Sequence, residues 1–246
     1  MNGQAETKMI RQICAVMGMM VVTACAAPVA PPQAPPSAPK SVVPTFSGSL
    51  TPLEAVNNFR TVVRTIEPVA EDICRQRSPQ LNCDFQIVVD DTVNAQPNAF
   101  QTVDANGRPI IAFTIPLIAT VRNQDELAFI MAHEAAHHIE GHLGRLQRNA
   151  SIGAELAGLI IGARDPETLR TAQQIGAAIG GRAYSKDFEL EADALGTVIT
   201  AAGGYDPLVG AEFFQRIPDP GDAFLGTHPG NADRVATVRR VAASLP

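Results

Sequence analysis

Apolar positions recur along the chain first at helical spacing, then in short strand-like runs, and then at helical spacing again. Residues 51–54, Thr-Pro-Leu-Glu, are typical of a capping box with a proline in the first turn, so they predict a helix that runs to about Arg77. Asn106 and Gly107 indicate a two-residue hairpin between the last two strand-like runs. The predicted strands cover residues 84–89, 98–103 and 108–114.

Helical patterns fill the second half of the chain. Asn123 is expected to cap a helix, with Glu126 as its capping-box partner. The run from Ile152 to Ala163 is apolar, too short to span a membrane and interrupted by Glu155, so we expect a buried helix there. The order of elements predicts an α+β fold that is mostly helical, with a small antiparallel sheet. Further helices are expected over residues 150–162, 166–181, 185–202, 207–216 and 231–243.

The composition supports a packed domain and argues against one class of partner. Hydrophobic residues make up 46% of the 246 positions and charged residues 18%, so a sizeable core can form. The net charge of −6 argues against a nucleic-acid partner, since phosphate binding requires a basic face. Trp is absent while Ala and Gly are abundant, which favours helices that approach one another closely.

Residues 1–24 are predicted to be an export signal that is removed from the mature chain. A positively charged start and an apolar stretch over residues 10–22 support this interpretation. The sequence Val-Thr-Ala-Cys, which ends at Cys25, resembles the lipobox of bacterial lipoproteins, in which the cysteine becomes the lipidated first residue. The alternative is an ordinary secretory signal that is cut near Ala27 or Ala30.

Residues 25–45 are predicted to form an extended tether between the lipid and a domain that covers residues 46–246. Residues 26–44 hold seven of the chain's 19 prolines, with Ala, Ser and Gln between them. Ala26, at the second mature position, favours the outer membrane over the inner one by resemblance to lipoprotein sorting signals. We therefore expect an outer-membrane lipoprotein that faces the periplasm.

Export also decides how two further cysteines are interpreted. Cys74 and Cys83 form an even pair in a compartment that favours disulfides, so a bridge between them is predicted. The alternative is two free thiols. A metal-binding role is disfavoured because no histidine or third cysteine lies nearby in the sequence.

Four of the five histidines lie within residues 133–142. His133 and His137 are four residues apart, so one helix places both imidazoles on the same face, where they can take two corners of a tetrahedral zinc site. Glu134 can accept a proton from a water molecule that the zinc ion has made acidic. The alternative is a polar helix with two unliganded histidines, whose burial in an apolar setting would be costly.

A third protein ligand is needed, and a later helix offers one. Glu189 and Asp193 are four residues apart, so Glu189 can bind the metal while Asp193 receives the outer N–H of a ligand histidine. Glu191 lies about 200° around the same helix and is expected to be solvated or to cap the helix. His138 and His142 are interpreted as structural or exposed. The alternative for Glu189 is an ordinary surface carboxylate.

These residues stand in a longer order of motifs. H-E-x-x-H is followed by Tyr-Ser-x-x-x-Glu-x-Glu-Ala-Asp from Tyr184, by Gly-Gly-Tyr-Asp-Pro from Gly203, and by Thr-His-Pro from Thr227 with Arg234 after it. In this combination the chain resembles the gluzincin zinc metallopeptidases of the CAAX-prenyl-protease and HtpX type, metallopeptidase family forty-eight. The resemblance covers roughly residues 50–243 and is strongest to the exported lipoprotein members.

The resemblance implies a zincin-type domain with a single zinc ion. His228 looks like the family's late histidine, which stabilises the oxyanion or covers the metal in the resting enzyme, and Arg234 looks like its companion. Without that context, a lone histidine in a Gly-rich loop is more often solvated. By this resemblance His133, His137 and Glu189 match the family's three zinc ligands. Glu134 matches its base, and Asp193 matches the carboxylate that supports a ligand histidine.

The sequence therefore predicts a zinc-dependent metalloendopeptidase, and the resemblance implies that it hydrolyses peptide bonds of unfolded or misassembled envelope proteins. An edge strand of the predicted hairpin over residues 98–114 can bind an extended substrate. One alternative is a zinc-containing periplasmic chaperone or assembly factor with little proteolytic activity, and the intact Glu134 counts against it. Another is a zinc-buffering lipoprotein, which would carry more exposed histidines or cysteines than one tight set.

Overall fold

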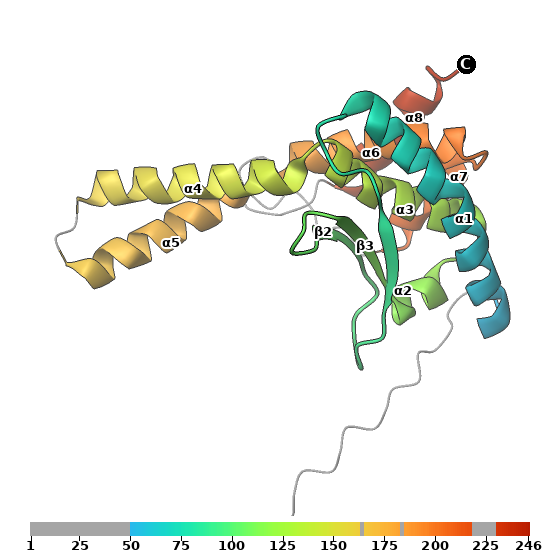
Figure 1. The fold of residues 1–246 in the computed structure, drawn as a ribbon, viewed down its shortest axis with the longest axis horizontal. Helices are drawn as coiled ribbons and strands as arrows, with labels where there is room; N and C mark the ends of the chain where they lie inside the picture. Colours follow the sequence, from blue (N-terminus) through green and yellow to red (C-terminus); the bar gives the residue numbers. More distant parts are fainter. Residues whose placement is uncertain (1–49, 163–164, 183–184, 218–229) are drawn as a thin grey trace, which may run out of the picture. The chain divides into compact units, whose positions relative to one another are not determined.

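Helices dominate the computed structural model, which describes residues 50–162, 165–182, 185–217 and 230–246 (Figure 1). The expected α+β class, mostly helical with one small sheet, is confirmed. The strands are β1 (Gln86–Asp90), β2 (Ala99–Val103) and β3 (Pro109–Thr114). The helices are α1 (Pro52–Arg77), α2 (Ile115–Thr120), α3 (Gln124–Ile139), α4 (His142–Ile161), α5 (Pro166–Arg182), α6 (Ser185–Ala202), α7 (Pro207–Gly210), the 3-10 helix η1 (Ala211–Gln215) and α8 (Asn231–Ala242).

The sheet is mixed, which corrects the prediction of a wholly antiparallel one. β3 lies in the centre, with β2 antiparallel on one side and β1 parallel on the other. Consecutive residues of β3, such as Ile111 and Ala112, are both buried, so both faces of this strand are covered. This favours the central position in the sheet, where both edges of the strand are paired. The hairpin occupies one edge of β3 with β2, so β1 joins the other edge. Among the described residues, β2 is paired along one edge only.

The hairpin between β2 and β3 turns through Ala105, Asn106 and Gly107, one residue more than the Asn-Gly pair predicted. The Asp104 N–H donates to the carbonyl of Arg108 at 2.9 Å and closes the loop. Gly107 has a φ of +80°, a left-handed conformation that glycine adopts at little cost. The Asp104 carboxylate accepts from the Asn106 N–H at 2.8 Å and thereby favours the longer loop.

α1 begins at the predicted capping box of Thr51 and continues through Pro68 to Arg77. In its last turn Cys74 forms a disulfide with Cys83, and the two Cα atoms are 5.7 Å apart. Both cysteines are buried, so the bridge joins the end of α1 to the segment that leads into β1. Because α1 also packs on α3, the bridge fixes one wall of the layer around α3.

α3 lies at the centre of the fold and contacts α1, α6, α7 and the sheet. Its N-cap is Asn123, as predicted, and the Asn123 side chain accepts from the Glu126 N–H at 2.8 Å. Glu126, however, does not complete a capping box. Its fully buried carboxylate accepts from the Arg122 N–H at 2.8 Å and pairs with the guanidinium of Arg216. The distant charge of Arg216 thus decides where Glu126 points.

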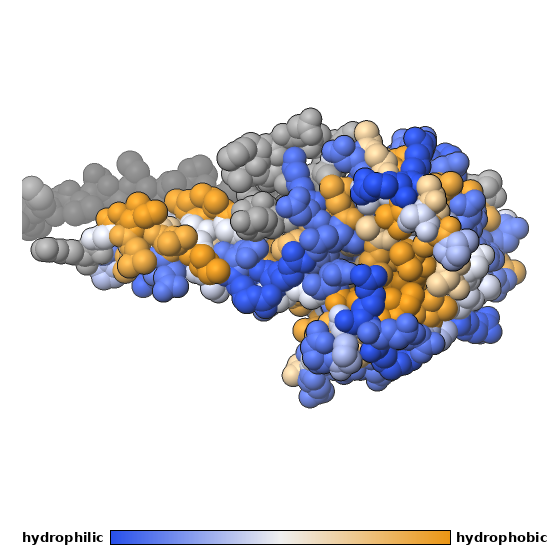
Figure 2. All heavy atoms as spheres, turned by 90° about the horizontal axis from the view of Figure 1, so that it is seen from above, coloured by the Kyte–Doolittle hydropathy of each residue, from blue (hydrophilic) through white to orange (hydrophobic). Residues whose placement is uncertain are grey.

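α4 and α5 pack against each other as a hairpin, which extends to one side in Figure 1. The prediction of a buried helix from Ile152 onward is wrong, because α5 covers only one face of α4. Leu159 is 73% exposed and Ile160 is 83% exposed, and apolar side chains of the hairpin lie at the surface in Figure 2. Within the described ranges, none of the helices combines the length and the hydropathy that a membrane span needs.

Candidate metal centre

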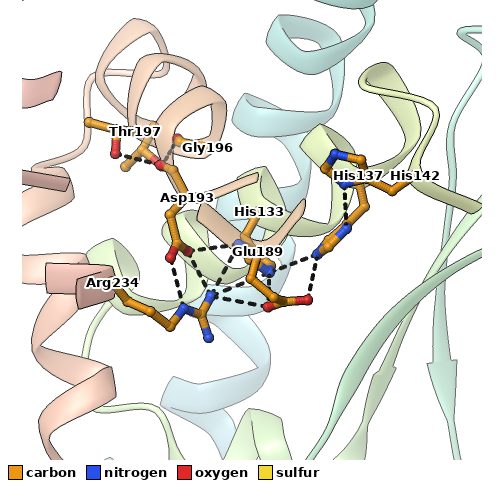
Figure 3. Close-up of polar contacts among 9 residues, drawn as sticks. His133, His137, His142, Glu189, Asp193, Gly196, Thr197 and Arg234 are labelled. Atoms are coloured by element: carbon orange, nitrogen blue, oxygen red, sulfur yellow. Dashed lines mark hydrogen bonds and ion pairs between the residues drawn. The ribbon is translucent and has the colours of Figure 1, made fainter. Parts of the chain in front are cut away.

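Three side chains from two helices converge between α3 and α6 (Figure 3). His133 and His137 lie one turn apart on α3, and Glu189 faces them from α6. The Nε2 atoms of the two histidines are 3.0 Å apart, and each lies 3.4 Å from one carboxylate oxygen of Glu189. The predicted ligands therefore meet at one point, although they are distant in sequence.

The spacing of these atoms fits a tetrahedral zinc ion. Two ligands that each lie about 2.0–2.1 Å from such an ion are about 3.3–3.4 Å apart. Each Nε2 atom lies 3.4 Å from a different oxygen of Glu189, which matches this separation, and the two Nε2 atoms are somewhat closer to each other, at 3.0 Å. Two imidazoles and one carboxylate are also a donor set of catalytic zinc sites, in which the fourth position stays open. The residues present can thus hold a zinc ion without a change in the fold.

His133 is oriented by a buried carboxylate. Its Nδ1 atom lies 2.9 Å from Oδ1 of Asp193, which leaves Nε2 to face Glu189. Burial and the charge of Arg234 lower the pKa of His133, but its bonds to Asp193 and Glu189 outweigh them and raise this pKa to about 9. Because a metal ligand must be the neutral imidazole, metal binding would displace a proton from His133.

Arg234 reaches the site from α8 and compensates the charge of Asp193. Its Nε and one terminal nitrogen donate to the two oxygens of Asp193 at 2.8 and 2.6 Å. The guanidinium carbon lies 3.8 Å from the centroid of the Phe214 ring, which supports it from one face. Although burial raises the pKa of Asp193, the bonds from Arg234 and His133 outweigh it and lower this pKa, so the carboxylate stays charged.

α6 approaches α3 most closely around Gly196. A side-chain carbon at Gly196 would lie 3.1 Å from the backbone nitrogen of His133 and 3.2 Å from its Cα atom. Glu189 and Asp193 lie about two turns and one turn before Gly196 on the same helix. The missing side chain therefore lets α6 come near enough for both carboxylates to reach the histidines.

Glu134 lines an open cleft beside these groups. The cleft has a volume of about 820 Å³ and is bordered by the start of β2, by α3 and α4, and by η1 and α8. Much of its wall is apolar and includes Phe100, Phe129 and Leu143. Burial raises the pKa of Glu134, which suits a carboxylate that has to accept a proton near neutral pH.

A polar chain behind His137 was not predicted from the sequence. The Nδ1 atoms of His142 and His137 are 2.8 Å apart, and Nε2 of His142 lies 3.0 Å from Oε2 of Glu191. Glu191 also pairs with Arg145, and its side chain is 42% exposed, so it is partly solvated, as predicted, and bound to two partners as well. Burial lowers the pKa of His142 to about 4, and the bond from Arg145 lowers the pKa of Glu191.

The break between α3 and α4 brings His142 to this position. Gly141 has a φ of +66°, so it ends α3 and turns the chain. α4 begins at His142, and the new helix direction returns its ring to His137. The only signal in the sequence was the glycine after Glu140, which marks the end of one helix but not the direction of the next.

The remaining predicted residues divide into two groups. His138 is buried, and its Nε2 lies 2.8 Å from the carbonyl of Asn82, which fits the structural role expected for it. Cys25 and His228 lie outside the described residues, as do the predicted signal and tether. Arg234, which the resemblance gave only as a companion of His228, is placed beside Asp193.

Two histidines on one helix, a glutamate between them and a third ligand from a second helix are arranged as in a metallohydrolase. The sequence model of peptidase family M48 matches residues 57–242 of this chain. The chain therefore belongs to peptidase family M48, a family of metallopeptidases.

Several bacterial proteins are similar to part of this chain. A Vibrio cholerae protein is 31% identical over 55% of this chain and 31% of its own length. An Escherichia coli O157:H7 protein is 30% identical over 48% of this chain and 27% of its own, and a Yersinia pestis protein is 28% identical over 59% and 32%. All three carry the name beta-barrel assembly-enhancing protease, the Vibrio protein provisionally. The chain matches about a third of the length of these relatives.

Proposed function

We propose that the chain is a zinc-dependent metalloendopeptidase that hydrolyses peptide bonds within unfolded or misassembled envelope proteins. The observation that carries this proposal is the convergence of His133, His137 and Glu189 beside Glu134 in an open cleft. Membership of a metallopeptidase family supports the reaction class. The relatives' name, which refers to beta-barrel assembly, supports envelope proteins as the substrates.

Each side chain of the site has its own role in the proposed hydrolysis. A zinc ion held by the three ligands would supply Lewis acidity toward a water molecule and a peptide carbonyl. Glu134 accepts the proton of the attacking water and can pass it to the departing amine. Asp193 keeps His133 in the tautomer that leaves Nε2 for the metal, and Arg234 keeps Asp193 charged.

The unpaired edge of β2 offers a binding surface for an extended substrate. Within the part of the chain that is described, β2 pairs with β3 alone, and residues 98–101 line the cleft. A polypeptide that adds to this edge would use its backbone N–H and C=O groups and would lie along the cleft that holds Glu134. Because these contacts use the backbone, the edge selects extended chain more than it selects a sequence.

The proposed location is the periplasmic face of the outer membrane. Residues 1–24 would be removed as a signal, Cys25 would carry lipid, and residues 25–45 would tether the domain of residues 46–246. The support is the lipobox-like sequence and the Pro-rich segment after it, together with the envelope substrates proposed above. The disulfide between Cys74 and Cys83 supports an oxidising compartment.

The proposal is tested by replacing Glu134 with Gln in the purified full chain. The variant should bind zinc as the wild type does, because Glu134 is not among the ligands. Its cleavage of casein should fall by about 10²–10⁴-fold, the usual contribution of a positioned base. Metal analysis and a casein assay with and without a chelator measure the two properties.

Glu155→Gln is the matched control, because Glu155 is an exposed glutamate on α4 and lies outside the cleft. It should retain both zinc and activity. Casein cleavage by Glu134→Gln at the wild-type rate would show that Glu134 is not the base. A wild type that binds zinc but cuts nothing would favour the chaperone alternative.

A further inference from the structure

We infer that His142 and Glu191 are positioning residues, which fix the ring of His137 so that its Nε2 atom faces the metal. The inference rests on the proposed function, because it takes His137 as a metal ligand. It gives a role at the site to two residues that the sequence analysis did not assign to it, and it gives each ligand histidine a carboxylate support from α6.

The contacts form a chain from α6 through α4 to α3. Figure 3 shows the His142 ring beside His137. The two Nδ1 atoms are 2.8 Å apart. Nε2 of His142 lies 3.0 Å from Oε2 of Glu191. Asp193, two residues after Glu191 on α6, contacts His133 directly. Glu191 supports His137 only through the imidazole of His142.

In each hydrogen bond of this chain, the chemistry of the groups determines which one donates and which one accepts. A metal on Nε2 of His137 requires the ring proton on Nδ1, so Nδ1 of His137 must donate. Nδ1 of His142 must then accept, and His142 therefore carries its proton on Nε2. That N–H donates to the carboxylate of Glu191, which as an anion can only accept. The charge of Glu191 thus fixes both tautomers.

The chain is also held rigidly in place. His142 is 1% exposed, and its ring stacks on Phe188 with the planes 9° apart and the centroids 4.7 Å apart. The guanidinium of Arg145 lies 4.0 Å from the Phe188 centroid and donates to Glu191. Because packing holds the imidazole of His142 and Arg145 holds the carboxylate of Glu191, neither group can leave this chain of contacts without the loss of several other contacts.

The test compares zinc affinity in two variants of His142. His142→Phe keeps a ring against Phe188 but removes both nitrogens, and it should weaken zinc binding by about 10–100-fold, as the loss of such supports usually does. His142→Asn keeps an acceptor near the former Nδ1 position and should recover part of this loss. Competition with a chromophoric chelator gives the Kd of each full-length protein.

His138→Phe is the matched control, because His138 is also buried on the α3 side but contacts the carbonyl of Asn82 and the side chain of Gln101. Its zinc Kd should stay within about twofold of the wild type. Thermal melting of the metal-free proteins separates a general loss of stability from a loss of zinc affinity.

Nitrogen-15 NMR of the imidazoles reports the tautomer of each histidine, which would not change in Glu191→Gln if Glu191 had only a structural role. The wild type should have His142 protonated on Nε2 and His137 on Nδ1, and Glu191→Gln should give mixed tautomers at His142. If the wild type binds zinc and His142→Phe binds it equally tightly, the inference fails while the proposed function stands. If the wild type binds no zinc, the proposed function and the inference both fail.

Discussion

At the scale of single residues, two carboxylates in the described part of the chain are fully buried, and each is paired with an arginine far away in the sequence. Asp193 is paired with Arg234, and Glu126 with Arg216. Removing one partner of such a pair leaves an uncompensated charge, which costs several kcal/mol. These arginines therefore stabilise the fold by preventing that cost.

The Glu126 pair predicts a large loss of stability. Arg216→Met should lower the free energy of unfolding by about 3 kcal/mol, because it leaves the Glu126 carboxylate buried without a cation. Urea unfolding in the presence of a chelator measures the effect without a contribution from metal. Arg60→Met, at an exposed position of α1, is the control and should leave the urea midpoint unchanged. Equal stability of the two variants would show that the ion pair is dispensable.

How far the site could be predicted depends on how far apart its residues lie. The period of one helix was enough to predict His133 and His137 as a pair of ligands. The same period on a second helix, between Glu189 and Asp193, was enough to predict Glu189. The contact from His142 to Glu191 joins residues 49 positions apart on different helices. No local period encodes such a contact, because it depends on how two helices cross.

Helix boundaries, at the scale of elements, followed from local chemistry. Thr51 and Asn123 cap α1 and α3 with their own side chains, so the signals lay within one turn of each boundary. The parallel pairing of β1 with β3 had no such signal, because it depends on which edge of β3 the hairpin leaves open. Pairing between strands is therefore harder to predict than their existence.

The approach of α6 to α3 predicts a specific effect at Gly196. Gly196→Ala should lower the melting temperature and weaken zinc binding, because the added carbon would press on the backbone of His133 and separate the two helices. Gly181→Ala is the control: its added carbon would meet only the Ala150 side chain, at 3.7 Å. There the gain in helix propensity should raise the melting temperature slightly. A higher melting temperature for Gly196→Ala would contradict a tight contact.

Burial, at the scale of the whole molecule, could not be predicted from apolarity alone. The outer half of α4 has the composition of a buried helix, yet α5 covers only one of its faces and the side chains beyond it are exposed. Composition shows which surfaces a chain can bury. Which of them it does bury depends on the elements that come to lie beside them.

The hairpin of α4 and α5 provides the corresponding test. A double change of Leu159 and Ile160 to Gln should alter the free energy of unfolding by no more than about 0.5 kcal/mol, because both side chains are largely exposed. Replacement of Leu127 by Gln on α3, where the side chain is fully buried, is the contrasting variant and should be strongly destabilising. A large loss from the double change, measured by urea unfolding, would mean that the tip of α4 is covered.

The edge of β2 that carries no partner strand among the described residues has a consequence for the proposed substrates, here called client proteins. If a client adds to this edge as proposed, it can do so only while a stretch of its own backbone is still unpaired, and its folding removes that stretch. Cleavage and folding would therefore compete for the same segment. A fast-folding client would escape before it is cut, and a stalled one would remain available, so the kinetic partitioning between the two outcomes would follow the time that a client takes to fold.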